Sequence, residues 1–101
     1  LLLDEPDRAL DFSNRHLLMQ HIRSIVSDGR CALMCIHSPE LALEYCDNIL
    51  LMKSGTILST INTHTDSLDI INEKMSLIYD NINVIECTDI NHKTHRVVVA
   101  L

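Results

Sequence analysis

Two acids and a histidine follow the first two apolar segments of the chain. Leu1–Leu3 leads into Asp4 and Glu5, and Cys31–Ile36 leads into His37. A carboxylate at the end of a strand can hold Mg²⁺, directly or through its waters, because this hard cation keeps several waters when bound. A second carboxylate beside it can polarise an attacking water as a general base. A histidine nearby can hydrogen-bond a phosphate, so these residue types suit phosphoryl transfer, which depends on positioning and charge stabilisation.

The sequence between these segments predicts how they are brought together. Apolar residues at helical spacing predict a helix over Asn14–Ser27, with Ser13 as its N-cap and Gly29 as its C-terminal stop. The apolar runs on either side predict strands over Leu1–Asp4 and Arg30–Ile36, both buried. Strand, helix and strand in this order predict a βαβ unit with parallel strands and a right-handed crossover. The two acids and the histidine then lie at one carboxyl edge of one sheet, where open α/β sheets bind ligands.

Further elements follow this unit. Ser38-Pro39-Glu40 supplies a cap, a proline for the first helical position and an acid for the first turn, and predicts a helix to about Tyr45. Two strands, Asn48–Lys53 and Thr56–Ile61, are expected on either side of the turn Ser54-Gly55.

The pattern changes after Ile61. Residues 62–66 are polar and are interpreted as a linker, and residues 67–79 are predicted to form one or two short helices. Ile82–Cys87 and Thr94–Leu101 are predicted as two strands around a turn. The chain is therefore expected to divide into a main body over residues 1–61 and a small α+β extension over residues 62–101.

Composition narrows the function classes. The 101 residues hold 8 Lys+Arg and 14 Asp+Glu, for a net charge of −6, with 3% aromatic residues. Such a chain lacks the basic footprint of a nucleic-acid binder. Its apolar runs fall far below the ~18 residues of a membrane helix, and no signal peptide is visible. We therefore expect a soluble, intracellular protein. Cys87, His92 and His95 form only a weak metal candidate, because they lack a fourth ligand.

Three motifs in this order resemble the second half of an ABC-type ATPase domain. The apolar run ending in Asp4 and Glu5 looks like a Walker B motif, Ala9-Leu10-Asp11 looks like the D-loop, and His37 looks like the switch histidine. The resemblance is close over residues 1–61. It implies α/β architecture, with the carboxyl-terminal half of a P-loop NTPase parallel sheet followed by a small α+β tail.

The resemblance also implies a role for each matching residue. It implies that Glu5 and His37 are catalytic, with Glu5 orienting the attacking water and His37 contacting the γ-phosphate. It implies that Asp4 holds Mg²⁺ and contributes to cofactor binding. Asp11, by the same resemblance, is a cofactor-binding residue that couples this site to the one across a nucleotide-sandwich dimer.

Two segments, Leu10–Asn14 and His37–Glu40, look like the ATPase subunits of importers for iron–siderophore, haem, cobalamin or molybdate. The cofactors implied are ATP and Mg²⁺. The partners implied are a second ATP-binding subunit, membrane permease subunits and, indirectly, a substrate-binding protein, with no nucleic acid expected. The location implied is cytoplasmic, peripheral on the inner face of the cell membrane.

Several features of that family are absent from the sequence. It has no G-x-x-x-x-G-K-S/T loop, its only glycines are Gly29 and Gly55, and it has no Ser-Gly-Gly-Gln signature. We therefore expect that the 101-residue chain alone does not hydrolyse ATP. Because the chain opens on an apolar strand, we expect a fragment of a larger ATPase. Asp7 and Arg8 stand where the family commonly has Thr and Ser, which bears on the expected dimer contacts.

Two alternatives stay open at this point. A soluble ABC-type ATPase of DNA repair or chromosome maintenance carries the same motifs, with long heptad-patterned segments upstream. A non-catalytic, truncated remnant would instead bind a partner through its exposed sheet edge. In isolation, the chain is expected to expose a sheet edge and helix faces that the missing half would cover, and so to be marginally stable or prone to aggregation.

Overall fold

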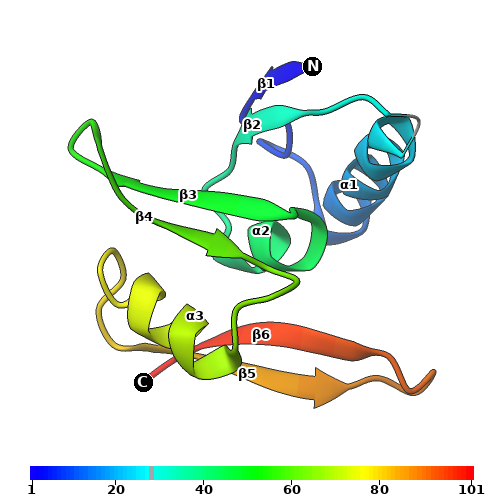
Figure 1. The fold of residues 1–101 in the computed structure, drawn as a ribbon. Helices are drawn as coiled ribbons and strands as arrows, with labels where there is room; N and C mark the ends of the chain where they lie inside the picture. Colours follow the sequence, from blue (N-terminus) through cyan, green and yellow to red (C-terminus); the bar gives the residue numbers. More distant parts are fainter. Residues whose placement is uncertain (28) are drawn as a thin grey trace. The chain divides into compact units, whose positions relative to one another are not determined.

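The computed structural model describes residues 1–27 and 29–101. Their elements, in chain order, are β1 (Leu2–Asp4), α1 (Phe12–Val26), β2 (Leu33–Cys35), α2 (Pro39–Tyr45), β3 (Asn48–Lys53), β4 (Thr56–Asn62), α3 (Leu68–Met75), β5 (Ile82–Thr88) and β6 (Thr94–Ala100) (Figure 1). The chain forms two compact units, Leu1–Tyr45 and Cys46–Leu101. The predicted α/β composition is confirmed, whereas the domain division after Ile61 stays a prediction.

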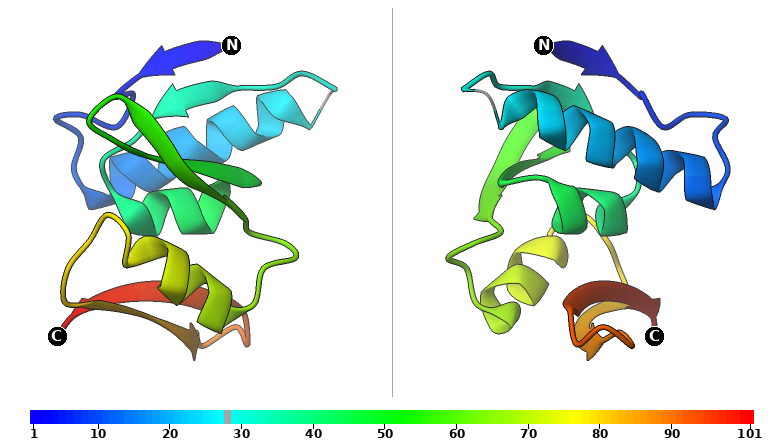
Figure 2. Two further views of the ribbon diagram at one scale, coloured as in Figure 1. Left: turned by 60° about the vertical axis from the view of Figure 1, so that its left-hand side comes forward. Right: turned by 90° about the vertical axis from the view of Figure 1, so that its right-hand side faces the viewer.

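The first unit is the predicted βαβ arrangement followed by α2. Strands β1 and β2 pair in parallel, with Leu2 opposite Leu33 and Asp4 opposite Cys35. Helix α1 lies alongside the strand pair, and α2 packs against α1 (Figure 2). The core of this unit is apolar and joins all four elements; it consists of Met19, Ile22 and Leu41 with Leu3, Leu18, Ala32, Met34, Ile36 and Tyr45 packed around them. This core fixes the ends of the two strands relative to each other.

The two strands are shorter and far more exposed than the sequence predicted. Leu2 is 79% exposed and Leu33 is 60% exposed. Side chains alternate between the faces of a strand, so Leu3 and Met34 enter the core while Leu2 and Leu33 point to the opposite face. The prediction of strands buried on both faces is therefore wrong for this chain, in which the face carrying Leu2 and Leu33 is open to solvent. This agrees with the expectation that the chain exposes apolar sheet surface.

Helix α1 begins two residues earlier than predicted, which changes its cap. Asp11 is extended, with φ −74° and ψ 175°, and its carboxylate accepts the backbone N–H of Asn14 at 2.9 Å. The predicted N-cap, Ser13, lies inside the first turn and does not cap the helix. Gly29, the predicted stop, lies just beyond the C-cap residue Ser27 and has a positive φ of 83°.

The second unit contains two antiparallel hairpins and a helix. Strands β3 and β4 pair around Ser54 and Gly55, both of which have a positive φ, as a tight hairpin turn requires. Strands β5 and β6 pair over their full lengths. Helix α3 contacts β5, and the Asn72 side chain bonds both the N–H (2.7 Å) and the C=O (2.9 Å) of Val84. The predicted elements of this region are confirmed, with small shifts at their ends.

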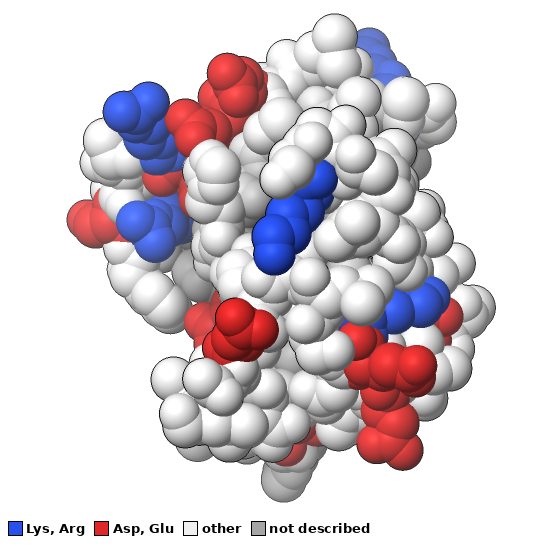
Figure 3. Space-filling model, turned by 90° about the vertical axis from the view of Figure 1, so that its left-hand side faces the viewer, with Lys and Arg blue, Asp and Glu red and all other residues white. Residues whose placement is uncertain are grey.

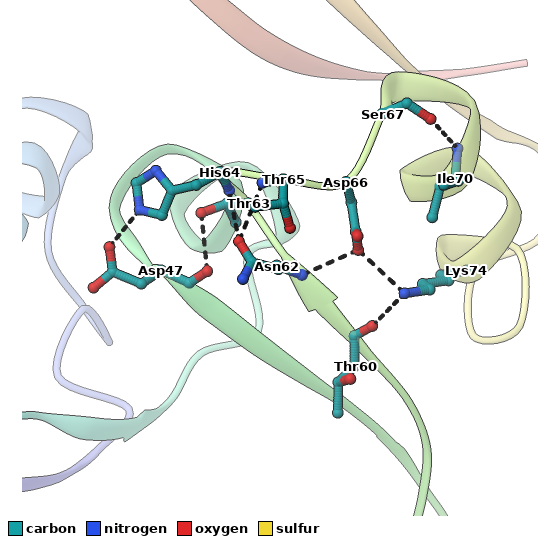
Figure 4. Close-up of polar contacts among 10 residues, drawn as sticks. All are labelled: Asp47, Thr60, Asn62, Thr63, His64, Thr65, Asp66, Ser67, Ile70 and Lys74. Carbon is teal, nitrogen blue, oxygen red and sulfur yellow. Dashed lines mark hydrogen bonds and ion pairs between the residues drawn. The ribbon is translucent and has the colours of Figure 1, made fainter.

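The segment predicted as a linker, residues 62–66, begins with the last residue of β4 and continues as a hydrogen-bonded turn (Figure 4). The Asp66 carboxylate accepts the N–H of Asn62 at 3.1 Å and pairs with Lys74 at 3.1 Å. Lys74 also donates to the carbonyl oxygen of Thr60 at 2.7 Å. The backbone hydrogen bond from Asn62 and then the bond with Lys74 lower the pKa of Asp66 below its ordinary value. This turn therefore ties the end of β4 to helix α3.

The β5–β6 turn is held by a carboxylate. Asp89 accepts the backbone N–H groups of Asn91 (2.8 Å) and Lys93 (3.0 Å), and contacts Nε2 of His95 at 2.7 Å. The His95 contact and these backbone bonds lower the pKa of Asp89. His95, the weak metal candidate, thus contacts a carboxylate that holds a turn. Within residues 1–27 and 29–101, no group of three or more His, Cys, Asp and Glu side chains is arranged to hold a metal ion.

Candidate functional site

The carboxyl edge of the β1–β2 pair carries the candidate site. The strand ladder continues one residue past β1, because the N–H of Glu5 donates to the carbonyl oxygen of Cys35 at 3.1 Å. Glu5 then adopts a left-handed conformation, with φ 47°, which is uncommon for a residue other than glycine. The chain therefore leaves the sheet abruptly at this residue, directly beside the end of β2.

Glu5 and His37 meet at this edge. Nε2 of His37 contacts Oε1 of Glu5. The His37 side chain is 83% exposed and the Glu5 side chain 28% exposed, so the pair is open to a ligand from the histidine side. The structure thus brings together the two residues to which the resemblance assigns catalysis, across a separation of 32 positions in the sequence.

A tight turn follows Glu5 and places the Arg8 side chain beside the Glu5 carboxylate. The N–H of Arg8 donates to the carbonyl oxygen of Glu5 at 3.1 Å, which closes a turn over residues 5–8. Nη1 of Arg8 lies 3.3 Å from Oε2 of Glu5. The two carboxylate oxygens of Glu5 therefore have different partners, a histidine on one and a guanidinium on the other.

Asp4, the expected Mg²⁺ ligand, is exposed and lies opposite Cys35 in the last residue pair of β1 and β2. It offers a single carboxylate beside Glu5. That fits Mg²⁺, which is commonly bound by one or two carboxylates together with waters and phosphate oxygens. Asp4 is thus the side chain that would hold the ion, and its role as a metal ligand stays a prediction.

Asp11 has a structural contact that the sequence did not predict, since it caps α1. The segment before it is braced by Arg15, whose Nε donates to the carbonyl oxygen of Leu10 at 2.9 Å. In the part of the chain that the structure describes, Asp11 does not join the contact between Glu5 and His37. Its cofactor-binding role is therefore a prediction that needs a partner subunit to be tested.

Sequence reasoning missed Arg8 as a neighbour of Glu5. Pro6 follows Glu5, and proline favours the second position of a four-residue turn, which places the first and fourth residues together. That signal could have predicted the contact. Asp7, the third residue of the turn, is buried, and its carbonyl oxygen accepts the N–H of Leu10 at 3.3 Å. Backbone hydrogen bonds therefore hold the turn both at Glu5 and at Leu10.

None of the helices in residues 1–27 and 29–101 has both the length and the apolarity needed to cross a membrane. Charged side chains of both signs are mixed among uncharged ones on the face drawn in Figure 3.

Comparison with known proteins finds similarity to proteins named hemin import ATP-binding proteins. It is 46% identical over 55 residues to the hemin import ATP-binding protein HmuV of Pseudomonas entomophila, a match that covers 54% of this chain and 22% of the relative. It is 40% identical over 60 residues to the protein of the same name from Burkholderia ambifaria, covering 58% of this chain and 22% of the relative. No protein-family model matches the chain.

The matched stretch is thus about a fifth of the length of each of these curated relatives. Their shared name bears out the resemblance carried by the Asp4-Glu5, Asp11 and His37 motifs. Over more than half of its length, the chain is similar to proteins named as hemin import ATP-binding proteins.

Proposed function

We propose that the chain is part of the ATP-hydrolysing subunit of an ABC importer and supplies the water-activating end of its nucleotide site. The observation that carries this proposal is the contact between Glu5 and His37 at the carboxyl edge of two parallel strands. It occurs in a chain whose curated relatives are named as hemin import ATP-binding proteins.

In this proposal the chain's residues act on a water and on a phosphate. Water attacks the γ-phosphorus of ATP, the bond from that phosphorus to the β–γ bridging oxygen breaks, and ADP and phosphate leave. Glu5 accepts the proton that the water gives up, and His37 holds the Glu5 carboxylate and faces the phosphate from the exposed side. Mg²⁺, when bound at Asp4, would supply positive charge against the phosphate oxygens.

The remainder of the site must come from sequence outside this chain. The β1–β2 pair is proposed to be the carboxyl-terminal part of a larger P-loop parallel sheet, whose phosphate-binding loop supplies the nucleotide cradle. The proposed partners are a second ATP-binding subunit and a membrane permease at the cytoplasmic face, with a substrate-binding protein acting indirectly. Among iron complexes, cobalamin and molybdate, the names of the relatives favour hemin as the cargo.

The direct test uses the complete gene product that contains this chain. Replacing Glu5 by Gln keeps the shape of the side chain but removes the proton acceptor. It should lower the rate of phosphate release by about 10²–10⁴-fold while ATP still binds. Glu73→Gln, at an exposed position of α3, is the matched control and should hydrolyse ATP like the wild type. Equal rates for the two variants would contradict the proposal.

Two further measurements separate this function from the alternatives. Co-purification of the complete protein with membrane subunits supports the importer, whereas retention on DNA supports the repair class. A start codon in the coding DNA at or near Leu1 would instead support the remnant. The isolated 101-residue chain should show no nucleotide-stimulated phosphate release, and release above that of its Glu5→Gln variant would contradict this expectation.

A further inference from the structure

The turn over residues 5–8 gives Glu5 a basic neighbour that its proposed role does not require. Arg8 contacts Glu5 twice, once through its backbone N–H at 3.1 Å and once through Nη1 at 3.3 Å. The backbone contact fixes where the Arg8 side chain starts. The guanidinium therefore stays within reach of the carboxylate without help from another element.

The Arg8 contact opposes the chemistry proposed for Glu5. A general base accepts a proton through a carboxylate lone pair, which must be free to face the attacking water. A guanidinium beside Oε2 forms a charge-assisted hydrogen bond with this oxygen and draws the carboxylate toward itself. Because His37 engages Oε1, the guanidinium engages the oxygen that is otherwise left for water.

We propose that Arg8 is a positioning residue that restrains the Glu5 carboxylate and slows basal ATP hydrolysis. This inference rests on the proposed function. The Arg8 side chain is 80% exposed, so its ion pair is an ordinary surface pair of modest strength. The restraint is accordingly small, corresponding to about a two- to fivefold effect on the rate. It should weaken as salt screens the two charges.

The first test measures hydrolysis by the complete gene product. Arg8→Gln should raise kcat about two- to fivefold at low ionic strength and leave the KM for ATP unchanged. The increase should disappear near 1 M salt, where the Debye length is about 3 Å. Arg30→Gln is the matched control, because it removes the same charge from an exposed arginine. Arg30 precedes Cys31, whose carbonyl oxygen lies 3.0 Å from the backbone nitrogen of Leu1, so Arg30 lies at the opposite end of the strand pair.

The second test observes the contact itself without nucleotide. In the complete protein labelled with carboxyl-¹³C glutamate, the signal missing from Glu5→Gln is that of Glu5. This signal should shift in Arg8→Gln and remain in place in Arg30→Gln. High salt should move the wild-type signal toward its position in Arg8→Gln, because screening weakens the ion pair.

Each other outcome overturns the inference. An unchanged or lower kcat in Arg8→Gln would mean that Arg8 does not restrain Glu5, and a raised KM with unchanged kcat would make it a contact for the nucleotide. An unshifted Glu5 signal would mean that the two side chains do not meet. If Glu5→Gln hydrolyses ATP normally, the proposed function itself fails. If only Glu5→Gln is impaired and Arg8→Gln behaves like Arg30→Gln, the proposed function stands and this inference fails.

Discussion

His37 and Glu5 meet because the strands that precede them run in parallel and end at the same level. The register places Asp4 opposite Cys35, so the residues that follow leave the sheet side by side. Glu5 extends the ladder through its bond to Cys35 and then turns, which directs its carboxylate to Nε2 of His37. The contact is thus a property of the βαβ unit, whose core sets the strand ends.

If Glu5 and His37 act as one unit, their substitutions are not additive. In the complete protein, His37→Ala should lower kcat by at least about tenfold, because Glu5 loses the group that holds it. Adding His37→Ala to Glu5→Gln should change the remaining rate little, since residues that act together lose their effect together. Steady-state phosphate release measures all three variants.

The control for this comparison of single and double variants is His21→Ala, which removes an exposed histidine from α1. It should leave kcat unchanged. If the fold-losses in kcat of Glu5→Gln and His37→Ala multiply in the double variant, the two side chains act independently. That result would be contrary to their contact in the structure.

A second prediction concerns Asp11, which caps α1. Asp11→Ala should lower the free energy of unfolding by about 1 kcal/mol, because the N–H of Asn14 loses its acceptor. Asp11→Asn should be nearly neutral, because asparagine caps helices equally well. Urea-induced unfolding, monitored by circular dichroism, gives the free energy of unfolding of both variants.

Ser13→Ala is the decisive control for the cap, because the sequence alone had favoured Ser13. In the structure Ser13 lies inside the first turn, so its loss should change the free energy of unfolding by less than about 0.5 kcal/mol. A larger loss for Ser13→Ala than for Asp11→Ala would place the cap at Ser13. If Asp11→Asn has the same free energy of unfolding as the wild type but hydrolyses ATP more slowly in the complete protein, the Asp11 carboxylate has the additional role that the resemblance implies.

These residues illustrate what sequence reasoning could reach. The βαβ order was sufficient to predict that Glu5 and His37 share a sheet edge, because parallel strands place their carboxyl ends together. The Asp11 cap was missed because a helix start that moves by two residues assigns the cap to another side chain. The exposure of Leu2 was missed because burial depends on neighbouring strands. The catalytic roles remain predictions, since they depend on a nucleotide and on residues outside this chain.

A third prediction concerns the contribution of Asp66 to stability and its dependence on pH. The N–H of Asn62 and then Lys74 hold its folded-state pKa below the ordinary value of 3.8, so the unfolded chain binds the proton more readily. Asp66 therefore contributes stability above the unfolded-state pKa, and loses that contribution as the pH falls through the lower folded-state pKa. Asp66→Asn should be less stable than the wild type at neutral pH, and the difference should shrink below about pH 4.

Urea unfolding at a series of pH values measures this difference directly. Asp80→Asn, which alters an exposed aspartate of the same unit, is the control. The gap between wild type and Asp66→Asn should narrow on acidification more than the gap between wild type and Asp80→Asn. A gap for Asp66→Asn that stays constant or widens on acidification would contradict the ion pair with Lys74.

The fourth prediction concerns the exposed face of the β1–β2 pair. Leu2 and Leu33 are cross-strand partners and are 79% and 60% exposed, so they form a continuous apolar surface. In the described residues, this strand pair has no third strand along its edges. Exposed apolar edges of this kind favour association with other chains. The isolated 101-residue chain should therefore self-associate as its concentration rises, which light scattering detects. Replacing both leucines by Lys should reduce this association, because charges on such a surface oppose pairing.

Ile90→Lys tests whether the association depends on the β1–β2 face or on any exposed apolar side chain. Ile90 is 94% exposed but lies in the turn between β5 and β6, outside both strands. A lysine there should leave the association of the isolated chain unchanged, because a single exposed apolar side chain is common on protein surfaces. If Ile90→Lys suppresses association as strongly as the double substitution, the β1–β2 face is not its cause. In the complete protein, by contrast, Leu2→Lys should impair folding if the upstream sequence covers this face, because a lysine would then be buried without a partner.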